Sequence, residues 1–152
     1  MCPLIFTGCL MRLLVSVISL VFLSACATSP TPKSLATPVP PDRLYSKQAK
    51  TSIDVATLVV TRDQGVLGSA CYFGLWIDTA LAGRFDVSET ATFYVPAGEH
   101  LLKVGRDPMG EGLCHPDTGS WVQRETMLKA GETKNFRISL DPSGTSDIHR
   151  AD

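Results

Sequence analysis

The residue types that could carry out catalysis are few in this 152-residue chain, and their spacing forms no catalytic motif. Ser69 stands in Gly-Ser-Ala, which lacks the Gly-x-Ser-x-Gly elbow that presents a nucleophilic serine. His100 follows a turn, His115 sits in a long loop, and His149 lies near the end of the chain. A hydrolase needs a nucleophile, a base and an orienting group brought together. We therefore interpret the three histidines as exposed loop residues and expect no enzymatic activity and no cofactor.

The segment 105–120 is rich in Gly and Pro and is a long stretch without a strand pattern inside the predicted β domain. Its glycines are followed by neither Gly-Lys-Ser/Thr nor a helix, so we do not expect it to bind phosphate. The alternative hypothesis is a small envelope enzyme or inhibitor with its site on this loop. Such a site would show buried polar groups in mutual contact, whereas an interaction module would show an open aromatic or apolar patch. The candidate contact residues of the loop are Arg106, Asp107, Glu111 and His115.

The most specific chemical signal is a single cysteine, Cys26, that follows an apolar run. Residues 13–23 carry no charge and only two serines, and as a helix they would reach about 16 Å, half of a bilayer core. Arg12 precedes the run, and Met11-Arg12 makes a better signal start than Met1. Residues 23–26, Leu-Ser-Ala-Cys, resemble the lipobox of bacterial lipoprotein precursors. The resemblance implies that residues 1–25 are a signal peptide, and that Cys26 is lipidated on sulfur and acylated on its new amino group.

An anchor at Cys26 predicts where the protein resides. Two or more acyl chains, such as palmitate, at about 0.8 kcal/mol per buried methylene would hold it firmly on a bilayer. An Asp after the cysteine would resemble the inner-membrane retention signal of Gram-negative lipoproteins. Ala27 stands there instead, so the resemblance favours the outer membrane, with the protein facing the periplasm. The alternative, an uncleaved anchor over residues 4–23, would bury Arg12 mid-membrane at about 2.5–3.5 kcal/mol.

The segment 26–54 reads as a proline-rich linker between the anchor and a folded domain. Five prolines in residues 27–42 favour extended polyproline II, so sixteen residues would span about 50 Å. Removal of residues 1–25 changes the formal net charge from −1 to −2, because Arg12 is the charged residue lost. A protein with this charge lacks the basic face that a nucleic-acid binder needs.

From residue 55 onward, apolar residues alternate with a period of two, which is typical of β-strands. Turn signals separate the runs, and no window has a helical stripe with caps. The pattern predicts an all-β fold for residues 55–152, a small antiparallel sandwich of about seven strands. Ala-Gly-Glu occurs twice, at 97–99 and 130–132, each time between two strands in what reads as a hairpin. The clearest predicted strands are residues 55–61, 71–77, 91–95, 122–128 and 135–140.

Several of these pieces occur in an order that carries a family resemblance. They are Leu-Trp-Ile-Asp at 75–78, Leu-Ala-Gly-Arg at 81–84, residues 93–102 with their Pro-Ala-Gly-Glu turn, and Leu-Lys-Ala-Gly-Glu at 128–132. Residues 56–140 thereby resemble PEGA-type domains and related uncharacterised lipoprotein domains of bacterial envelopes. The resemblance implies a small sandwich that binds or displays at the cell surface, with no catalytic residues to transfer.

Cys71 and Cys114 are the two cysteines of the domain. In an envelope compartment an isolated pair favours a disulfide, which would close a loop of about 44 residues and stabilise the fold by roughly 4 kcal/mol. A metal site with His115 would have only three ligands and lacks a Cys-x-x-Cys pair. Two unlinked thiols are the third alternative, and separated or reduced thiols would fit a thiol or metal sensor.

Aromatic residues supply the remaining binding hypothesis. If Phe73 and Leu75 face inward, Tyr72 and Trp76 lie on the opposite face of their strand, with Tyr94 alongside on another strand. Such rings can stack on sugars or form a hot spot for a protein partner, and the structural alternative is ordinary packing under the long loop. We expect a non-enzymatic, lipid-anchored module whose partners are envelope proteins, peptidoglycan or other glycans.

Overall fold

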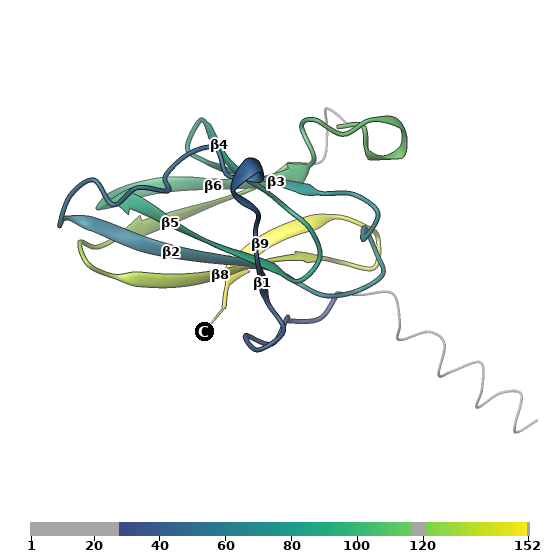
Figure 1. Ribbon diagram of the computed structural model, residues 1–152, viewed down its shortest axis with the longest axis horizontal. Helices are drawn as coiled ribbons and strands as arrows, with labels where there is room; N and C mark the ends of the chain where they lie inside the picture. The colour runs from purple at the N-terminus through teal and green to yellow at the C-terminus, as the bar shows by residue number, and fades with distance from the viewer. Residues whose placement is uncertain (1–27, 117–120, 152) are drawn as a thin grey trace, which may run out of the picture.

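The computed structural model describes residues 28–116 and 121–151 and shows two β-sheets packed face to face (Figure 1). One sheet has five strands in the order β1-β5-β2-β8-β9, and the other has four in the order β4-β3-β6-β7. Neighbouring strands are antiparallel except for the pairs β1–β5 and β2–β8, which are parallel. The expected all-β sandwich is confirmed. The elements are β1 (Thr37–Pro38), η2 (Pro41–Arg43), β2 (Val55–Arg62), β3 (Phe73–Ile77), β4 (Ala80–Phe85), β5 (Glu89–Pro96), β6 (Gly98–Arg106), η3 (Gly112–Cys114), β7 (Val122–Leu128), β8 (Thr133–Leu140) and β9 (Ser146–Arg150).

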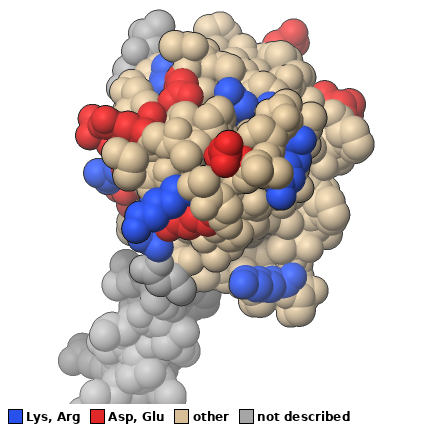
Figure 2. Space-filling model, turned by 90° about the vertical axis from the view of Figure 1, so that its left-hand side faces the viewer, with Lys and Arg blue, Asp and Glu red and all other residues tan. Residues whose placement is uncertain are grey.

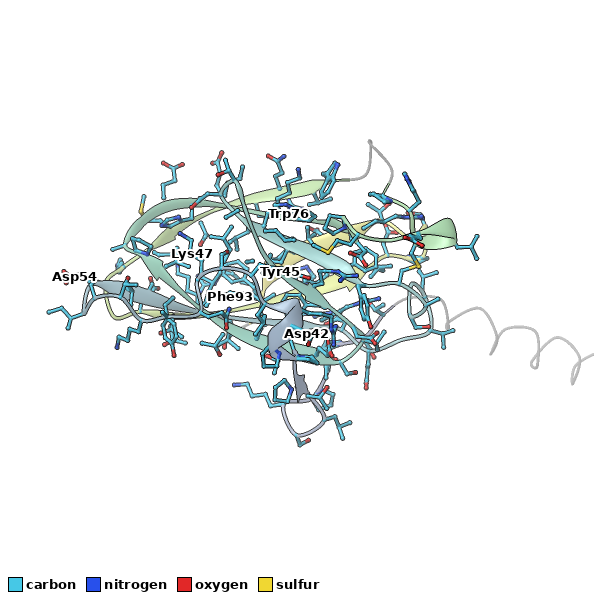
Figure 3. All side chains as sticks on the ribbon, turned by 45° about the horizontal axis from the view of Figure 1, so that its top comes forward. Asp42, Tyr45, Lys47, Asp54, Trp76 and Phe93 are labelled. Carbon is cyan, nitrogen blue, oxygen red and sulfur yellow. A yellow bond between two sulfur atoms is a disulfide. The ribbon has the colours of Figure 1, made fainter. Side chains whose placement is uncertain are left out.

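Alternation along the strands builds the core between the sheets. On β2 the side chains of Ala56, Leu58 and Val60 are fully buried, whereas the residues between them are partly exposed. Phe93 projects from β5 into the same layer and packs on Phe85 of the facing sheet, with ring centroids 6.3 Å apart (Figure 3). The described residues contain no helix long and apolar enough to cross a bilayer.

Both Ala-Gly-Glu turns connect the two sheets, so the hairpins expected there are wrong. Residues 97–99 lead from β5 of the five-stranded sheet to β6 of the other, and residues 130–132 lead from β7 back to β8. Gly98 and Gly131 have φ angles of 139° and 73°, which a glycine adopts without the strain that other residues meet. Among the described strands, the consecutive pairs that are hydrogen-bonded to each other are β3–β4, β6–β7 and β8–β9.

The segment 28–50, which we call the strap, packs on the sandwich, so the extended linker expected over residues 26–54 is wrong for this part. β1 of the strap pairs with the edge of β5, and Val39, only 4% exposed, joins the core. The backbone N–H of Tyr45 donates to the carbonyl of Ala82 on β4. Pro38 is tolerated in β1 because β1 is an edge strand, and proline lacks the N–H that an inner strand would need for its second neighbour. The strap thereby covers one edge of each sheet, β5 in the five-stranded sheet and β4 in the other.

Arg62 closes one end of the core. It continues the inward-facing row of β2 yet is charged and 1% exposed. Its guanidinium donates to the carbonyl oxygens of Cys71 (2.7 Å), Phe85 (2.9 Å) and Gly68 (2.7 Å), and it lies 4.6 Å from the ring centroid of Phe73. Burial lowers its pKa to about 10, so the group stays protonated at neutral pH. Arg62 therefore fastens the β2–β3 loop and the end of β4 to the core.

Candidate functional site

Two tryptophans and a lysine meet on the outer side of the four-stranded sheet. Trp76 of β3 and Lys103 of β6 are directly opposite in the register, and Trp121 immediately precedes β7. The indole rings are perpendicular, with centroids 4.6 Å apart and an interplanar angle of 81°. Lys103 Nζ lies 3.8 Å from the Trp121 centroid and 5.4 Å from that of Trp76, within cation–π range of both. We call Trp76, Lys103 and Trp121 the tryptophan face; Trp76 is labelled in Figure 3.

A pair of glycines lets the rings lie against the sheet. Gly74 of β3 and Gly105 of β6 are register partners. A Cβ on Gly74 would come within 2.5 Å of the Trp76 ring, and one on Gly105 within 2.5 Å of the Trp121 ring. Both distances are shorter than contacts between real atoms, so a larger residue at either position would displace an indole. Each ring consequently has one side on the backbone and stays partly exposed on the other.

Trp121 is the member of this face that sequence reasoning missed. It stands beyond the Gly/Pro-rich loop and outside any clear alternation, so its strand register could not be read. The signal that could have indicated it is the outward-facing glycine opposite Gly74, since a strand glycine often marks close approach of a large neighbour.

Tyr72 and Tyr94 do not join Trp76 in one aromatic face. The guanidinium groups of Arg43 and Arg84 lie 4.5 and 5.0 Å from the Tyr72 ring centroid, so this ring is packed between the strap and β4. Tyr94 lies on β5 of the other sheet, and its backbone N–H donates to Lys47 of the strap. The three-ring face expected from the sequence is therefore reduced to Trp76, with Trp121 as its partner.

The two arginines beside Tyr72 are held by carboxylates. Arg43 of the strap makes two hydrogen bonds to Glu89 of β5 (2.8 and 2.5 Å), and both side chains are nearly buried. Arg84 donates to both oxygens of Asp107 (2.7 and 2.5 Å). The hydrogen bonds that each arginine donates to its carboxylate raise the pKa of that arginine. These pairs join the strap and the start of the long loop to the strands.

The candidate residues of the long loop do not converge on one point. Asp107 is 2% exposed, and its Oδ1 also accepts the N–H of Met109 (3.0 Å), so it braces the loop. Arg106 is exposed and donates to the carbonyl of Leu113 (3.4 Å). Glu111 is exposed, and exposed His115 has Nδ1 2.9 Å from the Pro116 carbonyl. In the described part of the loop, buried Asp107 forms an ion pair with Arg84, which is itself only partly buried.

His100 is a strand residue with structural hydrogen bonds, so the prediction of an exposed loop histidine is wrong there. It lies on β6, with Nδ1 2.9 Å from an Asp78 oxygen and Nε2 2.9 Å from the Pro96 carbonyl. Burial alone would raise the pKa of Asp78, but hydrogen bonds from His100 and from the Leu101 N–H outweigh it and lower the pKa. His149 lies on β9.

The disulfide expected between Cys71 and Cys114 is present, with Cα atoms 5.4 Å apart. The bond links Cys71, the residue before Tyr72, to η3 in the long loop. It excludes the free-thiol and cysteine–metal alternatives for this pair of cysteines. Among the described residues no group of three or more His, Cys, Asp or Glu side chains could hold a metal ion. The lipidation site Cys26 and the signal segment 1–25 lie outside the described residues.

A groove that the sequence did not indicate runs between the strap and the outer face of the five-stranded sheet. Its volume is about 440 Å³, and its floor is formed by outward-facing residues of β2, β5 and β8. On these strands small and β-branched residues alternate with the core residues. Any solvent-exposed sheet face shows this pattern, so the sequence did not predict a groove here. It is lined by Pro30, Thr31, Lys33, Ala36, Val59, Thr61, Asp63, Thr90, Asn135, Phe136, Arg137 and Ala151.

Comparison of the chain with protein-family models and with curated proteins finds no match. In the described structure the tryptophan face lies on Gly74 and Gly105, which we call the glycine floor, and its two rings stay partly exposed.

Proposed function

We propose that this protein is a lipoprotein of the bacterial cell envelope, anchored through acylated Cys26 and acting as a non-enzymatic binding module. The lipobox-like residues 23–26 and the uncharged run before them support the anchor. The Cys71–Cys114 disulfide supports an oxidising compartment such as the periplasm. Ala27 after the cysteine favours the outer membrane. The resemblance to PEGA-type domains is consistent with this role.

The proposed ligand of the tryptophan face is a glycan, with peptidoglycan as the envelope glycan to test. The observation that carries the proposal is the perpendicular Trp76–Trp121 pair with Lys103 over both rings. An indole ring offers a flat apolar surface for the C–H face of a sugar, together with a polar N–H. The lysine ammonium adds hydrogen-bond donors for hydroxyl or carboxylate oxygens. The glycine floor fixes both rings in place, so little side-chain freedom is lost on binding.

The test is co-sedimentation of the mature protein with purified peptidoglycan. Trp76→Ala should raise the dissociation constant about tenfold, the loss expected for one stacked ring. Lys103→Gln keeps both rings and should weaken binding to a smaller extent. Tyr94→Ala is the matched control, because it removes a partly exposed ring from the other sheet. Near-ultraviolet circular dichroism checks that each variant is folded. Equal retention of wild type and Trp76→Ala would contradict the proposal.

A further inference from the structure

One end of the sandwich gathers four loops, and the chain enters the folded body there. β2, β4, β6 and β8 end at this end, and β3, β5, β7 and β9 begin there. We call the described connections 63–72, 86–88, 107–116 and 141–145 the anchor-side end. Thr28 is fixed to it: its N–H and Oγ1 donate to the Leu140 carbonyl (3.3 and 3.1 Å), and its Oγ1 accepts the Leu140 N–H (2.8 Å). Ser29 pairs with Gln64 in the β2–β3 loop.

The folded body therefore begins two residues after the proposed anchor. Two extended residues span about 7 Å. The proline-rich segment that would have lifted the domain by about 50 Å is the strap, which instead lies along the sheets. If Cys26 carries the acyl chains, the anchor-side end cannot move far from the surface of the bilayer.

This end also presents exposed apolar side chains. Val66 in the β2–β3 loop is 85% exposed, and Leu113 in η3 is 94% exposed. The disulfide from the adjacent Cys114 to Cys71 ties the loop of Leu113 to the loop of Val66. The opposite end faces the viewer in Figure 2 and shows Lys and Arg interspersed with Asp and Glu. Ile53, 86% exposed, is the large apolar residue beside the start of β2, away from the anchor-side end.

We propose that the anchor-side end is a membrane-contact surface, with Val66 and Leu113 inserted among the headgroups of a phospholipid bilayer. This inference rests on the proposed anchor at Cys26. Each exposed apolar side chain gains by leaving water, and the short connection keeps both at the interface without further binding energy. The exposed carboxylates of Glu111 and Asp141 lie at this end, so the proposed contact rests on the apolar side chains and not on attraction of basic residues to anionic lipid.

The experiment places an environment-sensitive nitrobenzoxadiazole label on the full mature protein purified from cells. The label is attached at Val66→Cys or at the matched control Ile53→Cys, whose native side chains are 85% and 86% exposed. Vesicles of phosphatidylethanolamine and phosphatidylglycerol supply the bilayer. The label at 66 should gain severalfold in fluorescence and shift to the blue, whereas the label at 53 should not change. Insertion of about twenty Gly/Ser residues before Thr28 should abolish the gain at 66, because such a linker spans about 25 Å.

The outcomes separate this inference from the proposed anchor. Intact mass shows whether residue 26 carries lipid. A lipidated protein on vesicles whose labels at 66 and 53 behave alike would overturn the membrane contact and leave the anchor in place. A mature protein without lipid would overturn the anchor, and the inference would fall with it. A gain at 66 that persists with the long linker would show contact that does not depend on the short connection, against the reasoning above.

Discussion

Replacement of Arg62 by Met tests whether a buried charge holds the anchor-side end together. Three hydrogen bonds from this charged donor are lost, to the carbonyls of Cys71, Phe85 and Gly68. At about 1.5–3 kcal/mol each they contribute roughly 4–9 kcal/mol. Burial opposes this: it lowers the pKa of Arg62 to about 10, a shift that corresponds to a net cost of roughly 3 kcal/mol at neutral pH, and Arg62 Nε has no hydrogen-bond partner. The balance predicts that Arg62→Met lowers the free energy of unfolding by about 3 kcal/mol.

The assay is thermal and urea unfolding of the oxidised protein at pH 7. A loss of about 3 kcal/mol corresponds to a fall in Tm of about 10 °C for a domain of this size. Arg124→Met is the matched control, because Arg124 pairs with Asp147 at the exposed rim and its side chain is 54% exposed. Its Tm should stay unchanged. Buried charges can sometimes be replaced by apolar residues without loss. An Arg62→Met protein as stable as wild type would refute the reasoning.

Replacing both Cys71 and Cys114 by Ser should lower stability by about 4 kcal/mol, the chain-entropy value for a sequence separation of 43, as measured by urea unfolding. Glu89→Gln leaves the nearly buried Arg43 guanidinium without its carboxylate, so about 3 kcal/mol should be lost and trypsin should cleave the strap faster; unchanged cleavage would contradict the strap's attachment. Folding lowers the pKa of Asp78, so its ionised carboxylate stabilises the folded state. This contribution is complete above the unfolded pKa of 3.8 and is lost as pH falls through the lower folded pKa. Unfolding at pH 5 and pH 3 should therefore show a smaller acid loss in Asp78→Asn than in wild type.

Strand positions followed from local pattern, since period-two alternation reflects which side of a sheet meets the core. β7 (Val122–Leu128) lies where the pattern placed it, and β2 (Val55–Arg62) differs by one residue. β9 (Ser146–Arg150) was not predicted, because only Ser146 and Ile148 face inward and the polar or charged residues beside them leave no apolar alternation in the sequence. The two Ala-Gly-Glu turns show a second limit. A turn sequence predicts a change of direction but not whether the next strand pairs with the last one or crosses to the other sheet.

The strap shows why composition alone misled. A proline-rich segment cannot form a core by itself, yet its extended backbone is ready to lie along a strand edge that other residues provide. Val39 is buried because it packs into the core of the sandwich, and Arg43 is held because it forms an ion pair with Glu89 of β5. The prediction of the aromatic face was incomplete for the same reason: Trp76 was predicted, but its partner Trp121 lies 45 positions further along the chain. Tertiary contacts of this kind have no local signature.

The chemical state of residue 26 in cells tests the central claim most directly. Cells expressing the protein are fed an alkyne-labelled palmitate, and the wild type is compared with Cys26→Ser. We predict that the wild type is labelled and recovered with membranes as a chain beginning at residue 26, and that Cys26→Ser is unlabelled and keeps its signal segment. An unlabelled wild type that begins upstream of residue 26 and is recovered free of membranes would contradict the account.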